Sequence, residues 1–464
     1  MLNFKDANVL IVKEIPNRNI SISSLMLSLG VKPYRMVNLN DPIEAVKRTF
    51  HHQFDILICD QTYRDSQLTA SDIVEQLQAS KAIGERTVIV MDCHADMSKD
   101  YSYYLADVPL LAESNLREVT EELRTQFERK NRIAPMLQPK PWDSEQEMEK
   151  RFQSFSQKYP EWQYDLLLHR GHYCLANQRT KEATGLYGLL IKQRRQKDPT
   201  LEVCYFLNAL ALNGQAREAQ VLHKKFAAGQ RKLGQPFTDM GALLQFSTGH
   251  LDNAYQCLSS SKQEYGMNLA QRTEMALLAV ALEKYDQALE LFANNLKCAE
   301  QLNRDLTQHT MNYLFALLMS WMANCDAGAL YQKKFKQLRE QVSRGRLSEA
   351  QNVQLALLTL HADYLVEKSW QVSAQKQLIS LSSMLPQCSM SFRLHALYIS
   401  AMLGNERVFN HIQQSITCGQ AVLTSCPLKS SSSLWMRQLN WEHFKLVTNR
   451  TTPVTAQYPS YACQ

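Results

Sequence analysis

Four alanines recur at a nearly constant spacing in the middle of the chain, and this period limits what the chain can fold into. Ala183, Ala219, Ala254 and Ala288 are 36, 35 and 34 residues apart. Two antiparallel helices with their turns consume about 34 residues, so the period predicts a series of helical hairpins. One hairpin cannot bury its apolar face alone, and neighbouring hairpins are therefore expected to stack and share a core.

The residues around each alanine follow a common pattern. Four positions later comes a bulkier side chain, namely Tyr187, His223, Leu258 and Phe292. Five positions earlier comes a turn or polar residue, namely Gln178, Gly214, Gly249 and Glu283. We expect each alanine where two helices cross closely, because a longer side chain would push their axes apart. The bulkier residue lies on the same helix face and is expected to fill the adjoining groove.

Composition and charge place further limits on the chain. Its 464 residues are enough for two or three domains, and 45% of them are hydrophobic. Apolar runs stop short of the roughly 18 residues that a membrane span requires, and the first residues lack a signal-peptide layout. Eleven cysteines without a Cys-x-x-Cys pair favour a reducing cytoplasm. We therefore expect a cytoplasmic protein without a membrane segment.

The two parts of the chain differ in net charge. Residues 1–130 hold 15 Lys and Arg against 19 Asp and Glu, a net of −4, whereas the remainder holds 51−15=36 against 45−19=26, a net of +10. The basic part could favour an acidic partner surface or the chain's own acidic region. Solvated surface charge explains the same count, because these residues are dispersed.

Short apolar runs alternate with amphipathic stretches in residues 1–130. The runs predict strands at Asn8–Val12, Tyr34–Val37, Asp55–Cys59, Thr87–Met91 and Pro109–Leu111. The stretches between them predict helices at Ile20–Leu29, Ile43–Thr49, Ala70–Ala79 and Leu116–Lys130. Such alternation predicts a five-stranded parallel sheet with helices on both faces, and its ligand crevice at the carboxyl ends of the strands.

Charged residues follow three of these strands directly. Lys13 and Glu14 follow the first, Asp60 the third and Asp92 the fourth. This arrangement resembles the receiver domain of two-component response regulators, over about residues 7–130. That family places two acids after strand one, a phosphoacceptor aspartate after strand three, a hydroxyl residue after strand four and a Lys-Pro pair after strand five.

The resemblance makes Asp60 the candidate phosphoacceptor, but the rest of the family's pocket is degenerate. The acid pair falls on Lys13 and Glu14, the hydroxyl position on Asp92, and the strand-five lysine on Ala112. Glu14 and Asp60 are then the candidate Mg²⁺ ligands, and no other cofactor is expected. The missing cation and the extra carboxylate disfavour an aspartyl-phosphate. We expect Lys13 to approach Asp60 as a fixed counter-ion, the alternative being a surface lysine and an Asp60 that caps a turn.

Prolines at 135, 139 and 141 predict a semi-rigid linker over residues 131–142. The region that follows, residues 143–424, resembles a divergent tetratricopeptide-repeat (TPR) solenoid. Gly171 occupies the family's small first-helix position, whereas Leu207 and Ala242 occupy it in the next copies. Beyond residue 300 the period loosens, with small residues at Ala329 and Ala374.

The apolar patterns of two further segments also predict their structure. Residues 425–464 are expected to form a capping helix around Trp435 and Trp441, followed by a frayed tail, and a partner-binding helix is the alternative. The segment Met311–Met322 is apolar nearly all round. Core packing is expected there, with a ligand pocket as the alternative.

Together, these features predict a non-enzymatic signalling adaptor of a two-component system. Its TPR-like region would bind proteins, and a degenerate receiver that competes for a histidine kinase or another response regulator would inhibit a phosphorelay. The alternative is a phosphorylation switch that uses Asp60 to control protein binding. A third hypothesis, a transcriptional or RNA-binding regulator, depends only on the net positive charge, and nucleic acid is not the expected partner.

Overall fold

The computed structural model describes residues 3–411, apart from 15–20, 50–51, 64–67, 85, 94–105, 111–113, 138–142, 178, 194–199, 229–234, 249, 324–327, 367–370, 386–387, 389, 404 and 406. It divides into two compact units. The first comprises the chain up to Leu244 together with Gln256–Asn268, and the second comprises Gln245–Tyr255 and the described residues from Leu269 onward.

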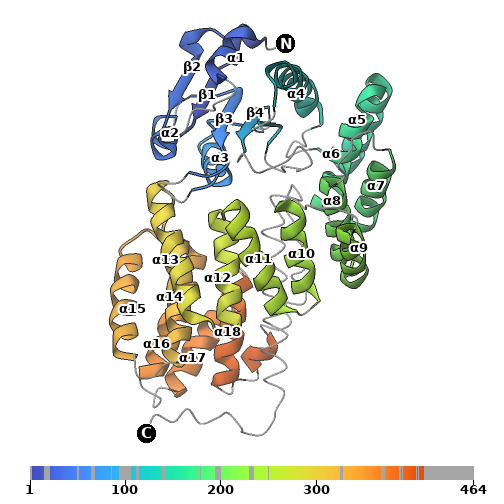
Figure 1. Ribbon diagram of the computed structural model, residues 1–464. Helices are drawn as coiled ribbons and strands as arrows, with labels where there is room; N and C mark the ends of the chain where they lie inside the picture. The colour runs from blue at the N-terminus through green and yellow to red at the C-terminus, as the bar shows by residue number, and fades with distance from the viewer. Residues whose placement is uncertain are drawn as a thin grey trace. The chain divides into compact units, whose positions relative to one another are not determined.

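The amino-terminal region forms a parallel sheet, as the alternating pattern predicted. Its strands are β1 (Val9–Val12), β2 (Met36–Leu39), β3 (Ile56–Asp60), β4 (Val88–Asp92) and β5 (Val108–Leu110). They pair in the order β2-β1-β3-β4-β5, all parallel, which is the flavodoxin-like order (Figure 1). The fold class predicted for this region is confirmed, with strand ends that differ by one or two residues.

Helices cover both faces of the sheet. They are α1 (Ile22–Ser28), α2 (Pro42–Arg48), α3 (Ala70–Ala79) and α4 (Leu116–Leu137). One face packs on α1 and α4 through a core that includes Val9, Ile58 and Val90 with Leu25 and Leu123. The alternate strand residues, such as Leu57 and Met91, point to the other face and are also buried. Helix caps follow the sequence, since Asp41 accepts from the Ile43 amide at 2.8 Å and Asn115 from the Glu118 amide at 2.9 Å.

Helix α4 differs from the prediction at its carboxyl end. It continues to Leu137, so that residues 131–137 of the expected linker are helical, and Pro135 lies within the helix. The extension has a partner, because Ile133 joins an apolar cluster with Met148, Phe152, Phe155 and Leu166. Burial of this cluster explains why the helix continues beyond residue 130 and includes Pro135.

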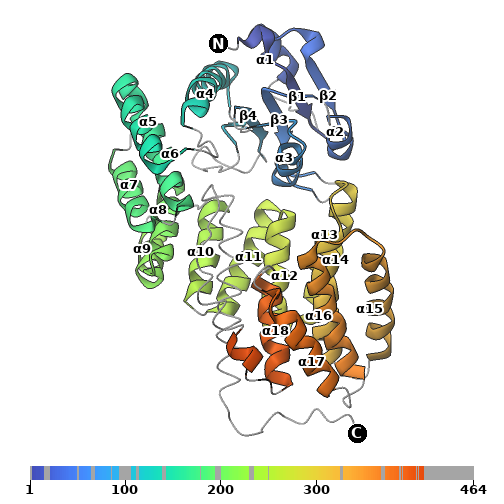
Figure 2. The same cartoon turned by 180° about the vertical axis from the view of Figure 1, so that it is seen from behind.

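The remaining chain is helical. The helices are α5 (Glu145–Lys158), α6 (Gln163–Ala176), α7 (Thr180–Lys192), α8 (Thr200–Leu212), α9 (Ala216–Ala228), α10 (Gln235–Ser247), α11 (Leu251–Tyr265), α12 (Leu269–Ala281), α13 (Tyr285–Gln301), α14 (Thr307–Ala323), α15 (Gly328–Ser343), α16 (Glu349–Val366), α17 (Gln371–Ser382) and α18 (Met390–Met402) (Figure 2). Sequential pairs such as α6 and α7, or α12 and α13, pack closely, so the predicted helical hairpins are confirmed. No helix in the described part of the chain combines the length and the apolar content needed to cross a bilayer.

Candidate functional site

The strand ends of the sheet bring together the three charged residues that we call the Lys13 pocket: Lys13, Asp60 and Asp92. Strand register explains why they meet. Val12 lies opposite Cys59, so the next residue of each strand places Lys13 beside Asp60, and Asp60 lies opposite Asp92. The Lys13 Nζ donates to Asp60 Oδ1 at 2.9 Å and to Asp92 Oδ2. The side chains are 7%, 15% and 18% exposed, so Lys13 is not a surface lysine.

Backbone contacts hold the pocket in place. The Glu14 amide donates to Asp60 Oδ2 at 2.8 Å, so both oxygens of the Asp60 carboxylate are hydrogen bonded. The amide of Gln61 donates to the Asp92 carbonyl at 3.0 Å and ties β3 to β4. Below them the buried Tyr63 hydroxyl donates to the Val12 carbonyl at 3.0 Å. The pocket is therefore a constrained ion-pair cluster.

Burial and charge act in opposite directions on the pocket's pKa values. Burial tends to lower the pKa of Lys13, but its hydrogen bonds to Asp92 and Asp60 raise that pKa by more, to above the ordinary 10.5. Stabilisation by charged Lys13 is thus complete below pH 10.5 and is lost only as the pH rises through the folded-state value. Burial raises the pKa of Asp60, against the lowering effect of Lys13.

The remaining residues assigned to this pocket are only partly described. Glu14 is half-buried and contacts Asp60 through its backbone amide. Ala112, the expected strand-five position, lies outside the described residues. Searching the described part of the chain finds no group of three or more His, Cys, Asp or Glu side chains that could hold a metal ion. The Lys13 ammonium lies 2.9 Å from Asp60 Oδ1 and already places a positive charge on an oxygen that Mg²⁺ would need, which disfavours the ion at this carboxylate.

The four alanines predicted to mark helix crossings are all fully buried. Each is the fourth residue of its helix, in α7, α9, α11 and α13, and each has 0% exposure. Each amide donates to the carbonyl four residues earlier at 3.0 or 3.1 Å, which starts the helix in the same way every time. The repeat-packing role of Ala183, Ala219, Ala254 and Ala288 is therefore consistent with the observed geometry.

The residue five positions before an alanine lies in the turn that precedes the helix, and the backbone conformation of that turn accounts for the residue type. Gly214 has a φ of 83° and Glu283 a φ of 61°, which is the left-handed conformation that ends many helices. The residue after each donates its amide to a carbonyl five positions earlier, as Gln215 does to Leu210 and Lys284 to Ala279. Gln178 and Gly249 lie outside the described residues.

The bulkier residues four positions after the alanines pack as predicted, with one difference. Tyr187, Leu258 and Phe292 are buried, and the Tyr187 ring lies so close to Gly171 that a Cβ there would be 2.6 Å from it. His223 is only half-buried and stacks on Phe237, with ring centroids 3.9 Å apart. The glycine at position 171 is thus required by the tyrosine that it faces.

Beyond residue 300 two small residues fit the loosened repeat pattern, and one of them is buried while the other is exposed. Ala374 is 3% exposed and is again the fourth residue of its helix, α17. Ala329 is exposed because it is the second residue of α15, whose buried residues are Phe335 and Val342. In Met311–Met322 most side chains are buried in α14, which agrees with core packing. The expected capping helix lies outside the described residues.

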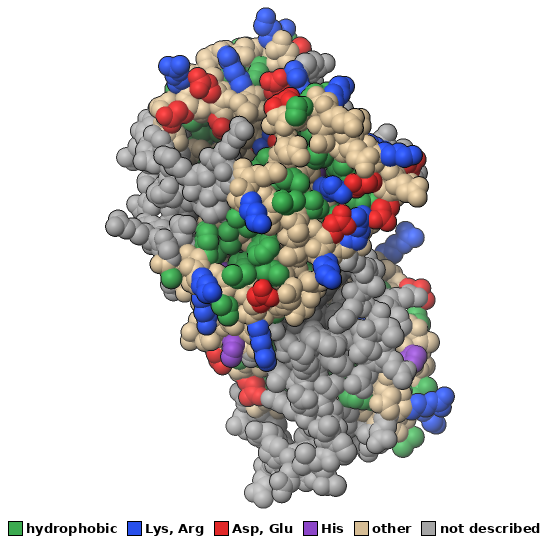
Figure 3. Space-filling model, turned by 90° about the vertical axis from the view of Figure 1, so that its right-hand side faces the viewer, with side chains coloured by type: hydrophobic (Ala, Val, Ile, Leu, Met, Phe, Trp, Pro, Cys, Tyr) green, Lys and Arg blue, Asp and Glu red, His purple; other side chains and the backbone are tan. Residues whose placement is uncertain are grey.

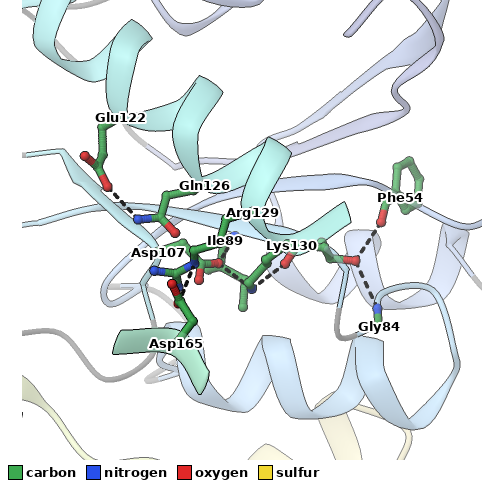
Figure 4. A network of polar contacts seen from close by, with 10 residues as sticks. Phe54, Gly84, Ile89, Asp107, Glu122, Gln126, Arg129, Lys130 and Asp165 are labelled. Atoms are coloured by element: carbon green, nitrogen blue, oxygen red, sulfur yellow. Dashed lines mark hydrogen bonds and ion pairs between the residues drawn. The ribbon is translucent and has the colours of Figure 1, made fainter. Parts of the chain in front are cut away.

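Sequence reasoning missed one buried and two partly buried polar contacts. Within α14, α16 and α18, His361 Nδ1 lies 2.8 Å from His395 Nε2, and both rings are buried. These histidines are 34 residues apart, so the repeat period could have indicated the pair. On α4, Lys130 pairs with Asp107 at 2.6 Å and Arg129 with Asp165 at 3.3 Å, which connects the sheet to α6 (Figure 4). No sequence pattern pointed to these two pairs.

Comparison of the chain with protein-family models, with curated proteins and with solved structures gave no match.

Proposed function

We propose that this chain is a non-catalytic signalling adaptor of the two-component type, located in the cytoplasm. Its helical hairpins would bind partner proteins, and its α/β region would act as a receiver that does not run an ordinary phosphorylation cycle. The expected partners are a histidine kinase or another response regulator. Competition for such a partner would inhibit a phosphorelay.

One observation carries the proposal: the Lys13 ammonium lies between Asp60 and Asp92. Phosphoryl transfer to a carboxylate needs a free nucleophilic oxygen and a Mg²⁺ ion held by several oxygens. Here Asp60 Oδ1 is bound to Lys13 and Oδ2 to the Glu14 amide, at 2.9 and 2.8 Å. Asp92 places a second carboxylate on the same ammonium. The lysine therefore supplies internally the positive charge that a metal would otherwise bring.

The helical region supports the binding role by its architecture. Stacked hairpins present extended surfaces, and the residues that do not pack between helices are free to contact other proteins. The burial of Ala183, Ala219, Ala254 and Ala288 supports such stacking. We also propose that this helical region is a TPR array.

Labelling with acetyl phosphate and Mg²⁺ tests the receiver half of the proposal. Intact-mass spectrometry of the full chain measures the added phosphoryl group. We expect the wild type and the Asp60→Asn variant to carry the same amount of label, because Asp60 does not accept the group. The matched variant Lys13→Asp restores an acid pair beside Asp60, and it should bind Mg²⁺ in a calorimetric titration where wild type does not. Mg²⁺-dependent label on wild type that is lost in Asp60→Asn would instead support the phosphorylation switch.

A further inference from the structure

The outer faces of helices α7 and α9 carry an unusual combination of exposed side chains. Leu189 on α7 is 47% exposed and Val221 on α9 is 52% exposed. Five cations accompany them, all exposed: Lys181, Lys192, Arg217, Lys224 and Lys225. We call these seven residues the α7–α9 surface. On the face seen in Figure 3, hydrophobic side chains gather beside Lys and Arg side chains.

The two helices present this surface together. Both pack against α8, and Thr180 at the start of α7 bonds to Asn213 in the turn before α9 at 3.3 Å. Gly185 occupies the position 36 residues before Val221, which is the repeat spacing. Gly188, one turn further along α7, lies against the half-buried Phe206 ring, with 3.6 Å between that ring and a Cβ at the glycine. The Cβ position of the exposed Gly185 has no other group within 4 Å, so this glycine leaves open space on the outer side of α7 for an apolar group of a partner.

None of the five cations of this surface forms an ion pair within the described residues. The only acids on α7 and α9 are Glu182 and Glu218. Glu182 pairs with Arg179 and Arg170, and Glu218 accepts from the Gln215 amide side chain at 2.8 Å. The surface is therefore apolar and uncompensated in positive charge.

The next two equivalent helices, α11 and α13, do not share this composition. Two residues before the buried alanine, the exposed residue is Lys181 in α7 and Arg217 in α9 but Asp252 in α11 and Asp286 in α13. Two residues after it, Val221 is replaced by Gln256 and Glu290. The hairpin scaffold does not require cations or apolar residues at these positions, because the same scaffold forms with acids.

We propose that the α7–α9 surface docks an acidic amphipathic helix of a partner protein. Its leucine-type residues would contact Leu189, Val221 and the open space beside Gly185, while its carboxylates would pair with the surrounding cations. An apolar centre with a charged rim is the usual anatomy of a protein interface, and complementary charge favours the encounter. A nucleic acid would use the cations but not the small apolar centre, and two apolar side chains bury little area in an anionic membrane.

The inference deepens the proposed adaptor role and rests on it. The adaptor proposal and the docking proposal can fail separately, because labelling at Asp60 concerns a different part of the chain from the α7–α9 surface. Loss of the docking surface would leave the degenerate receiver unchanged. A phosphorylated Asp60 would leave the docking surface unchanged.

Fluorescence anisotropy with the full chain tests the surface. The probe is a fluorescein-labelled synthetic helix that carries a leucine stripe flanked by glutamates, and its counterpart has lysines in place of the glutamates. We expect only the acidic probe to bind, with affinity that falls as salt is added. The double variant Lys224→Glu/Lys225→Glu should weaken binding about tenfold or more, and Leu189→Ser with Val221→Ser about fivefold, because rim charges and apolar anchors both contribute.

Matched controls separate this surface from general charge effects. Lys297→Glu reverses an exposed lysine on α13 and should leave probe affinity unchanged. Unchanged thermal melting of each variant would exclude misfolding as the cause. Equal binding of both probes, or of wild type and the double variant, would overturn the proposal. So would tighter binding of duplex DNA or phosphatidylglycerol vesicles that Leu189→Ser and Val221→Ser leave intact.

Discussion

Both the α/β region and the helical hairpins bring groups into close contact away from solvent, but the two regions do so with different chemistry. At the strand ends the contact is polar, and Lys13 compensates the charges of Asp60 and Asp92. At the helix crossings the contact is apolar, and alanines with 0% exposure present only a methyl group to the neighbouring helix. The first depends on charge balance and the second on volume. Substitutions that change only one of these quantities should therefore affect the two regions differently.

The largest effect is expected from removing the charge in the Lys13 pocket. Lys13→Met leaves two largely buried carboxylates without their cation, and the α/β region should lose about 3 kcal/mol of stability, the low end expected for breaking a buried pair. Hydrogen exchange of β1 and β3 peptides in increasing urea measures this loss. Adding Asp92→Asn should recover part of it. A loss below about 1 kcal/mol would mean that charge balance is not what holds this region together.

The next prediction concerns a fall in pH and the buried contact between His361 and His395. Burial lowers the pKa of His361 to about 4, from an ordinary 6.5. A depressed histidine pKa means that the stabilisation is complete above pH 6.5 and is lost as the pH falls towards 4. The second unit should lose up to about 3 kcal/mol in this window, measured by urea unfolding. His361→Gln should flatten the profile, whereas His411→Gln, at an exposed site, should not.

A change of volume without charge should affect the hairpins next. Ala288→Leu adds bulk at a helix crossing and is expected to cost about 2 kcal/mol in unfolding free energy. Ala329→Leu adds the same atoms at an exposed position of α15 and should stay within about 0.5 kcal/mol. Thermal unfolding of both variants gives the comparison. Equal effects would show that Ala288 is not at a tight crossing.

The smallest effect concerns the turns. Gly214→Ala introduces a side chain at a φ of 83° and should destabilise its hairpin by about 1 kcal/mol. The reverse substitution, Glu283→Gly at a φ of 61°, should be neutral or stabilise by up to about 1 kcal/mol. Opposite signs in the two melting temperatures would confirm the shared turn geometry. A stabilising Gly214→Ala would contradict it.

Local patterns predicted the secondary structure well wherever the residue type alone was sufficient. Alternation of apolar runs indicated five strands, and Ala70–Ala79 was predicted with its observed bounds as α3. Predictions were less accurate where distant contacts decide. Helix α4 extends through Pro135 because Ile133 packs on residues of α5 and α6, which no local pattern could reveal. Ala329 fitted the small-residue pattern, but its place in α15 leaves it exposed.

By itself, the sequence determined the period of the hairpins, the parallel sheet and the neighbourhood of Lys13, Asp60 and Asp92. Each of these follows from spacing along one chain, because strand alternation and helix length are set by local geometry. Only the tertiary structure decided that Lys13 bonds to both carboxylates, that His361 meets His395, and that Leu189 and Val221 stay exposed among exposed cations. These outcomes depend on the distances and burial of residues far apart in the chain, which spacing alone does not specify.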